Sequence, residues 1–252
     1  MTHVDSYGTL MQRQVTSEPE RIVEELEIRG FSLAASGLTA SEIDSIRKSS
    51  GVLLATKPDA QQPDIVRAPC LFDKAFLDIA LHPLMREVIG RMILGRIVLN
   101  QQNLVRNPAA GRTYSQARFH RDLPYQHFVS SRPLAINVLL AIDEFTSENG
   151  GTMLLPGSHH VEYYPSQQFV ENQALQVEAP AGTLIFLNAM TYHAGGINDS
   201  PNDRIALNHV FASPLLRKQV DFNQVIDPTT RALLTPEARD LLDLPNPDSA
   251  HD

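Results

Sequence analysis

Apolar residues in the first part of the chain recur at helical spacing. Ile22 and Leu26 lie one helical turn apart, which predicts one buried face of an amphipathic helix. Ser17 precedes this stripe as the expected N-cap, and Glu20 is placed to complete a capping box with it. Gly30 follows the last apolar position and predicts the end of the helix.

A second helix and a helical pair follow a short strand expected at residues 31–34. Thr39 and Glu42 repeat the capping-box pattern, so a helix is expected to run to about residue 48. Residues 55–69 hold three prolines and many polar residues, which indicates a long connection. Helical spacing returns at 74–91 and is broken near Pro83, where a new helix can begin.

From residue 93 the pattern changes to alternation and short apolar runs, both typical of strands. The expected strands are 97–106, 116–122, 134–142, 152–155, 183–187 and 205–211. The apolar run 134–142 suggests a strand buried on both faces, and 148–151 has the composition of a hairpin turn. A short helix is expected near 237–242. Helices followed by many short strands predict an α+β domain with an antiparallel sandwich or barrel core.

Composition narrows the class of protein. The length of 252 residues fits one domain over 1–252, with flexible tails at 1–16 and about 244–252. The net charge of −8 argues against nucleic-acid binding. Cys70 is the single cysteine, which excludes an intrachain disulfide and suggests a cytoplasmic location. Residues 1–14 lack the apolar core of a signal peptide, and no apolar run is long enough for membrane insertion.

The candidate chemistry centres on His120 and Asp122. On an extended strand, residues two apart project from the same face, so this imidazole and carboxylate can share a metal ion. His193, before a pair of glycines, offers a third ligand. Two histidines and one carboxylate are typical of non-haem Fe(II) oxygenases. A zinc hydrolase using these ligands is the alternative, although the helical His-Glu-x-x-His pattern is missing.

Four blocks of sequence resemble the phytanoyl-CoA dioxygenase family of iron(II)- and 2-oxoglutarate-dependent oxygenases. They are residues 119–125 (FHRDLPY), 149–159 (NGGTMLLPGSH), 193–200 (HAGGINDS) and Arg204. The resemblance covers about residues 30–211 and implies a double-stranded β-helix, or jelly roll, with flanking N-terminal helices. It further implies that His120, Asp122 and His193 bind Fe(II) as the catalytic centre, and that Arg204 binds the distal carboxylate of 2-oxoglutarate.

The reaction implied by this resemblance is the hydroxylation of an aliphatic C–H bond by O2, with release of succinate and CO2 and with ascorbate as a reductant in vitro. Related halogenases carry Gly or Ala in place of the carboxylate. Because Asp122 is kept, hydroxylation is favoured over chlorination. Desaturation or cyclisation by the same iron site and a catalytically inactive jelly-roll binding protein remain alternatives. Further candidates for co-substrate binding are Asn208, on the same face of its strand as Arg204, and Gln101 and Asn103.

The expected substrate is a small molecule, and the charge pattern suggests that it is anionic. Residues 106–132 contain five arginines and a single acid, Asp122. A positively charged entrance to the site would concentrate anionic ligands. Arg118, Arg121 and Tyr125 are the candidate substrate-binding residues. The alternative is that some of these arginines only solvate a loop. Residues 55–69 and 161–173 are candidate lids on length alone.

Overall fold

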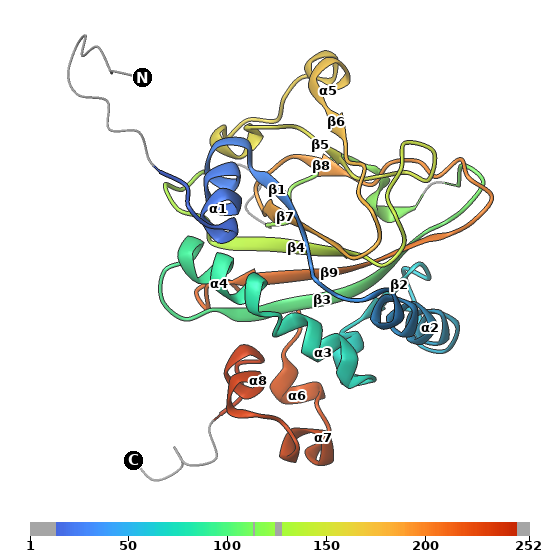
Figure 1. The fold of residues 1–252 in the computed structure, drawn as a ribbon, viewed down its shortest axis with the longest axis vertical. Coiled ribbons are helices and arrows are strands. Elements are labelled where there is room, and N and C mark those ends of the chain that lie inside the picture. Colours follow the sequence, from blue (N-terminus) through green and yellow to red (C-terminus); the bar gives the residue numbers. More distant parts are fainter. Residues whose placement is uncertain (1–13, 113, 124–127, 246–252) are drawn as a thin grey trace.

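Two antiparallel sheets face each other in the computed structural model, which describes residues 14–112, 114–123 and 128–245 (Figure 1). The larger sheet has the strand order β1-β7-β4-β9-β3-β2, and the smaller has the order β6-β5-β8. The strands are β1 (Phe31–Ala35), β2 (Ile65–Arg67), β3 (Val98–Asn107), β4 (Ala135–Ala141), β5 (Met153–Leu154), β6 (Leu175–Gln176), β7 (Thr183–Asn188), β8 (His193–Ala194) and β9 (Arg204–Ala212). This arrangement confirms the predicted α+β class.

Helices cover the face of the larger sheet that points away from the smaller one (Figure 1). The α-helices are α1 (Glu18–Arg29), α2 (Ala40–Thr56), α3 (Lys74–Ala80), α4 (Pro83–Met92), α5 (Gln167–Gln173), α6 (Phe222–Val225), α7 (Pro228–Ala232) and α8 (Pro236–Leu241). The 3-10 turns are η1 (Pro69–Leu71), η2 (Ser115–Ala117) and η3 (Ser158–His160). Of these helices, α5 lies on the side of the smaller sheet (Figure 1).

The central strands are buried on both faces because helices cover one face and the smaller sheet covers the other. On β4, Ile136, Val138 and Leu140 belong to the core beneath the helices. The alternate residues Ala135 and Ala141 pack in the two clusters on the opposite, inner face. The prediction of a strand buried on both sides is confirmed.

Helix ends follow the local sequence, with one exception. Gly30 ends α1 in the left-handed region at φ 83°, and Thr39 and Glu42 form the predicted capping box at the start of α2. The box predicted for Ser17 is wrong, because its side chain makes no capping hydrogen bond. The Glu20 carboxylate instead accepts from the backbone N–H of Thr16 at 2.8 Å and from its hydroxyl at 2.9 Å.

Four further expectations differ from the structure. Helix α2 continues to Thr56, and β2 forms inside the segment predicted to be a long connection, where it pairs with β3. No strand covers 116–122: this segment contains η2 and then a single β-bridge at His120. The turn at 148–151 joins no hairpin, because β4 and β5 belong to different sheets.

The C-terminal segment is more ordered in structure than its composition suggested. The predicted helix near 237–242 is confirmed as α8, and α6 and α7 were not foreseen. Leu244, placed in a tail by the sequence, packs in the core at 5% exposure. Residues 1–13 and 246–252 lie outside the described ranges, so the flexible tails stay a prediction, as does the assignment of 1–252 to one domain. Among the described residues, no helix has the length and apolar character needed to cross a membrane.

Candidate metal centre and co-substrate site

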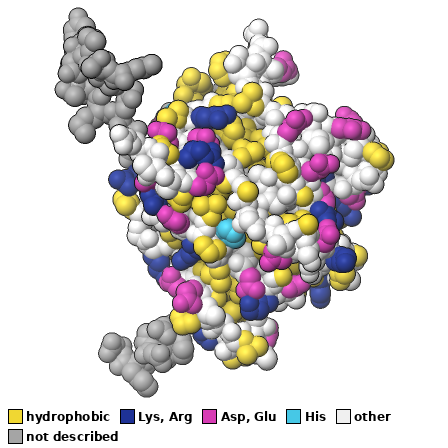
Figure 2. Space-filling model, viewed as in Figure 1, with side chains coloured by type: hydrophobic (Ala, Val, Ile, Leu, Met, Phe, Trp, Pro, Cys, Tyr) yellow, Lys and Arg dark blue, Asp and Glu magenta, His cyan; other side chains and the backbone are white. Residues whose placement is uncertain are grey.

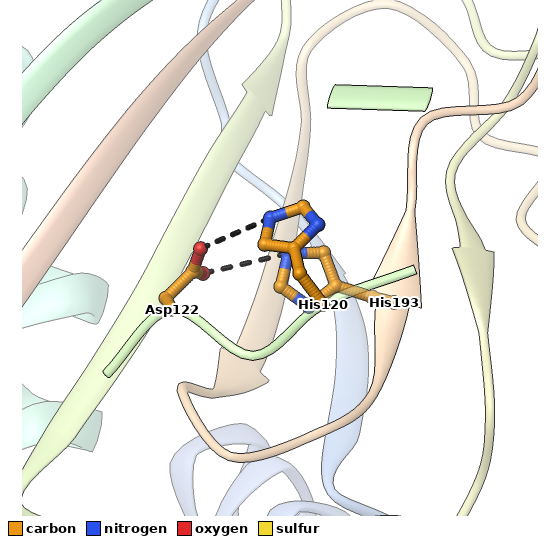
Figure 3. A group of neighbouring side chains, drawn as sticks. All are labelled: His120, Asp122 and His193. Carbon is orange, nitrogen blue, oxygen red and sulfur yellow. Dashed lines mark ion pairs between the residues drawn. The ribbon is translucent and has the colours of Figure 1, made fainter. Parts of the chain in front are cut away.

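The two predicted histidine ligands lie side by side because their segments form a β-bridge. His120 donates its backbone N–H to the carbonyl of His193 at 2.8 Å, and His193 donates back at 3.0 Å. His193 begins β8, whereas His120 lies outside the named strands. Their ring centroids are 4.5 Å apart, and the carboxylate of Asp122 faces both rings (Figure 3).

The ligand atoms converge on one point. His120 Nε2 lies 3.4 Å from Asp122 Oδ1, and His193 Nε2 lies 3.4 Å from Asp122 Oδ2. One ligand atom from each of the three residues lies within 4.8 Å of the others. Metal bonds to such ligands are about 2.1 Å long, so an ion fits between these atoms. Two imidazoles and one carboxylate on one side leave the other coordination positions open, which matches the donor set of non-haem Fe(II).

Hydrogen bonds to backbone carbonyls hold both imidazoles in the orientation that a metal requires. His120 Nδ1 lies 2.7 Å from the carbonyl of Arg118, and His193 Nδ1 lies 2.8 Å from that of Thr191. A carbonyl can only accept, so each Nδ1 carries the proton and each Nε2 presents its lone pair. Partners of this kind fix the tautomer of metal-binding histidines.

The Asp122 carboxylate is held by a residue that sequence reasoning did not single out. Asn137, on β4, donates its side-chain amide to Asp122 Oδ2. It is 1% exposed, and the available signal was its polar side chain within the apolar run 134–142. The hydrogen bond leaves Oδ1 and a lone pair of Oδ2 for a cation.

The pKa values of Asp122 and His193 favour the protonation states that bind a cation. Burial would raise the pKa of Asp122, but the neighbouring His193 and His120 and the amide of Asn137 hold it below its usual value. Burial, together with the charge of His120, lowers the pKa of His193 despite Asp122. Burial also acts to lower the pKa of His120, but hydrogen bonding to Asp122 and its charge outweigh this and raise it. An ionised carboxylate and a neutral imidazole are what metal binding requires.

Arg204 begins β9 and is buried at the end of the inner face. Its Nε donates to the carbonyl of Asn149 at 3.3 Å, and its Nη2 donates to that of Gly150 at 3.1 Å. The guanidinium carbon lies 3.9 Å from the ring centroid of Phe145. Because a guanidinium has five N–H bonds, the remaining ones are available for a carboxylate, which pairs with this group in parallel. Burial lowers the pKa of Arg204.

Sheet register places Arg204 and the metal centre on the same face. Alternate residues of β9 run from Arg204 through Asn208 to Val210, and Val210 lies opposite Asn137 of β4. Asn137 contacts Asp122, so the guanidinium and the metal ligands both lie between the two sheets. This relationship fits a co-substrate that spans from the metal to Arg204.

The other predicted co-substrate residues project from the same inner face. Asn103 of β3 pairs in register with Asn208, and Gln101 lies opposite Val210. Asn103 donates to the Gln101 side-chain oxygen at 3.2 Å. The side-chain oxygens of Asn103 and Asn208 are buried and have no partner among the described residues. Buried polar atoms are nearly always hydrogen-bonded, so these oxygens mark a place for a ligand, and their role stays a prediction.

The predicted substrate-binding residues separate in the structure. Arg118 is exposed. Arg121 is not at the surface: it is 1% exposed, and its guanidinium donates to backbone carbonyls in the segment Ser158 to Tyr163. The residue therefore anchors a loop, and we do not retain it as a substrate ligand. Tyr125 lies outside the described residues.

Two of the five arginines in residues 106–132 pair with acids from other segments. Arg106 lies 2.8 Å from Asp64, and Arg112 lies 3.5 Å from Asp203. On the face shown in Figure 2, basic and acidic side chains are intermixed. Of the five, Arg118 and Arg132 are exposed without an acidic partner among the described residues.

Paired glycines allow the loops around Arg204 to pack together. A Cβ built on Gly150 would lie 2.5 Å from the Gly196 carbonyl oxygen, and one on Gly196 would lie 2.5 Å from that of Gly151. Such distances are far below van der Waals contact, so the two loops meet only through glycine. Asn107 links them by donating to the carbonyls of Gly150 and Gly196 at 3.2 and 2.9 Å.

Solved structures share this fold. The epimerase SnoN, in complex with Fe3+, alpha ketoglutarate and nogalamycin RO, matches with a TM-score of 0.62 at 17% identity, over 77% of this chain and 83% of that one. The likeness confirms the predicted jelly roll.

Curated relatives match over part of their length. Uncharacterized protein Rv1501 of Mycobacterium tuberculosis is 28% identical over 162 residues, which are 63% of this chain and 59% of the relative. The Fe(II)/2-oxoglutarate-dependent dioxygenase nvfF of Aspergillus novofumigatus is 31% identical over 175 residues, which are 66% of this chain and 56% of the relative. The chain thus spans less than two thirds of the length of these relatives.

The profile of the family described as phytanoyl-CoA dioxygenase (PhyH) matches residues 29–206. That range contains the three candidate metal ligands, Arg204 and both glycine pairs. On this match, the chain belongs to the phytanoyl-CoA dioxygenase family.

Proposed function

We propose that this protein is a non-haem Fe(II)- and 2-oxoglutarate-dependent dioxygenase that hydroxylates an aliphatic C–H bond of a small molecule, releasing succinate and CO2. The observation that carries the proposal is the geometry of the three ligands. Both imidazoles donate Nδ1–H to backbone carbonyls, and both Nε2 atoms flank the carboxylate of Asp122. Family membership and the name of the relative nvfF support the same activity.

When bound, the ferrous ion, 2-oxoglutarate and dioxygen supply the oxidant for an unactivated C–H bond. The residues of the chain bind and orient these groups. His120, Asp122 and His193 would hold the ion from one side, and Asn137 keeps the carboxylate turned towards it. Arg204 would hold the distal carboxylate of 2-oxoglutarate with charge-assisted hydrogen bonds.

The inner face would exclude water around these groups. Small and apolar residues such as Ala135 and Val210 line it beside the metal ligands. Burial there strengthens the interaction of Arg204 with an anion, because the surrounding dielectric constant is low. Gln101, Asn103 and Asn208 supply amide groups that would orient the co-substrate or the substrate.

A two-part experiment tests this function. The wild-type protein, supplied with Fe(II), ascorbate and 2-oxoglutarate under air, should form succinate, and His193→Ala should not, because one metal ligand is lost. His160→Ala is the matched control, since His160 is exposed and outside the three-residue cluster. Calorimetric titration of the Mn(II)-loaded protein should show binding of 2-oxoglutarate.

The alternatives predict other results. A catalytically inactive binding protein would form no succinate, and a zinc hydrolase with the same ligands would not bind 2-oxoglutarate. Either outcome would overturn the proposal. Once a substrate is found, a product with one additional oxygen atom separates hydroxylation from desaturation, cyclisation or the epimerisation named for the structural neighbour SnoN.

We further propose that the substrate is anionic, and the exposed Arg118 supports this class. Its backbone carbonyl accepts from His120 Nδ1, so the backbone of this residue lies next to the metal centre. Small carboxylates and phosphate esters should stimulate succinate release more than neutral alcohols of similar size. Arg118→Ala should abolish that preference and leave the affinity for 2-oxoglutarate unchanged. An unaltered preference would remove the idea.

A further inference from the structure

The side chain of Tyr114 lies at the co-substrate end of the inner face, and none of the roles assigned above uses it. A Cβ built on Gly195 would lie 1.8 Å from the Tyr114 hydroxyl oxygen and 2.6 Å from its Cζ. The phenol therefore fills the space that a side chain at residue 195 would take. Gly195 follows His193 by two residues, so the hydroxyl lies close to the segment that carries a metal ligand.

The same hydroxyl lies beside the guanidinium of Arg204. Burial raises the pKa of Tyr114, and the positive charge of Arg204 partly opposes this effect. All the polar hydrogens of a guanidinium are donors, so the phenol oxygen faces it as an acceptor. The phenol O–H is then left to donate to a third group. Among the residues that the structure describes, none accepts a hydrogen bond from it.

Arg204 and Tyr114 thus present unused donors to the same place. Two N–H bonds of Arg204 are used by the carbonyls of Asn149 and Gly150 and another faces the phenol oxygen of Tyr114, so the others can meet an anion. A carboxylate has two oxygens, each of which accepts more than one hydrogen bond. It can accept from the guanidinium and the phenol together, and charge-assisted bonds of this kind are the strong ones.

We propose that Tyr114 binds the distal carboxylate of 2-oxoglutarate by donating its phenol O–H to one oxygen while Arg204 donates N–H groups. The inference rests on the proposed function and extends it to a residue that no sequence pattern singled out. Tyr114 directly precedes η2 and lies six residues before His120. The co-substrate would therefore also fasten the segment that leads into the metal ligands.

The test is the Tyr114→Phe variant, which removes the hydroxyl and keeps the ring. Binding of 2-oxoglutarate to the full chain loaded with Mn(II) is measured by calorimetry, so that no turnover interferes. A hydrogen bond to a charged group corresponds to about 10-fold or more in affinity, and we expect a loss of that size. Pyruvate keeps the keto acid and lacks the distal carboxylate, so its affinity should be the same for both proteins.

Two controls make the result specific. Tyr163→Phe removes a phenol hydroxyl from a side chain that is 68% exposed and should leave both affinities unchanged. The affinity for Mn(II) alone should also be the same in all three proteins. An equal affinity of Tyr114→Phe and wild type for 2-oxoglutarate would overturn the inference, as would an equal loss for pyruvate. Failure of the wild type to bind 2-oxoglutarate would overturn the proposed function as well, so the two failures can be told apart.

Discussion

Arg121 Nη2 lies 2.7 Å from the carbonyl oxygen of Val161, inside the protein. The same guanidinium also donates to the carbonyls of Ser158 and Glu162 at 3.0 and 2.9 Å. Arg121 lies between His120 and Asp122 in the sequence. Its hydrogen bonds therefore connect the backbone of these two candidate metal ligands to the loop that follows β5. Residues 161–173 are a predicted lid, and the hydrogen bonds from Arg121 hold its first residues in place.

Replacing Arg121 should therefore destabilise the protein. Arg121→Lys keeps the charge but cannot reach several carbonyls at once, and a buried polar group left without a partner costs about 1–3 kcal/mol. We expect the free energy of unfolding to fall by about 2–4 kcal/mol, measured by urea denaturation. Arg118→Lys, at an exposed position, should change it little. An unchanged midpoint for Arg121→Lys would show that the buried contacts are not stabilising.

The Asn137 amide should control metal affinity through Asp122. Asn137→Ala removes the donor that orients the carboxylate, and losing an outer-shell partner typically weakens metal binding about 10- to 100-fold. We expect a change in this range for Mn(II), measured by calorimetry. Asn172→Ala, at an exposed position in α5, is the control. Equal affinity in both variants and the wild type would argue against an orienting role.

His209 should make the protein less stable as the pH falls. Burial lowers its pKa from 6.5 to about 4, and its Nε2 has no partner among the described residues. The unfolded chain therefore binds more protons between these values, so the stability contribution is present above pH 6.5 and is lost as the pH falls towards 4. By pH 5 the loss is about 2 kcal/mol.

This contribution can be separated by substitution. In His209→Gln, the drop in unfolding free energy between pH 7.5 and pH 5 should be smaller by about 2 kcal/mol. His159, whose pKa burial also lowers to about 4, continues to contribute in the variant. Asn172→Ala, at an exposed position in α5, removes no titratable group and should retain the wild-type drop. The same drop in His209→Gln would contradict the assignment.

Two glycine substitutions should act in opposite directions. A Cβ on Gly151 would lie 2.1 Å from the carbonyl oxygen of Val177, so Gly151→Ala should lower the unfolding free energy by about 1–3 kcal/mol. Gly51 lies in α2 with no atom within 4 Å of the added Cβ. Gly51→Ala should raise the unfolding free energy by about 0.5–1 kcal/mol. Equal effects in a thermal melt would refute the steric argument.

Much of the site could be found from the sequence because its ligands come in short, recognisable blocks. His120 and Asp122 lie close together as predicted, although no strand covers residues 116–122. Asn137 and Tyr114 were missed for different reasons. Asn137 contacts Asp122 through the pairing of distant segments, and Tyr114 is brought to Arg204 by a loop with no periodic pattern.

The sequence alone determined the features that depend on near neighbours: the end of α1 at Gly30, the capping box of Thr39 and the apolar run of β4. The tertiary structure decided which distant groups meet. It buried Arg121 against backbone carbonyls and paired Arg106 with Asp64. The sequence pattern alone places both arginines in one positively charged cluster. The reason is physical. Capping and periodicity act within a few residues, whereas sheet register joins segments whose separation along the chain leaves no local signal.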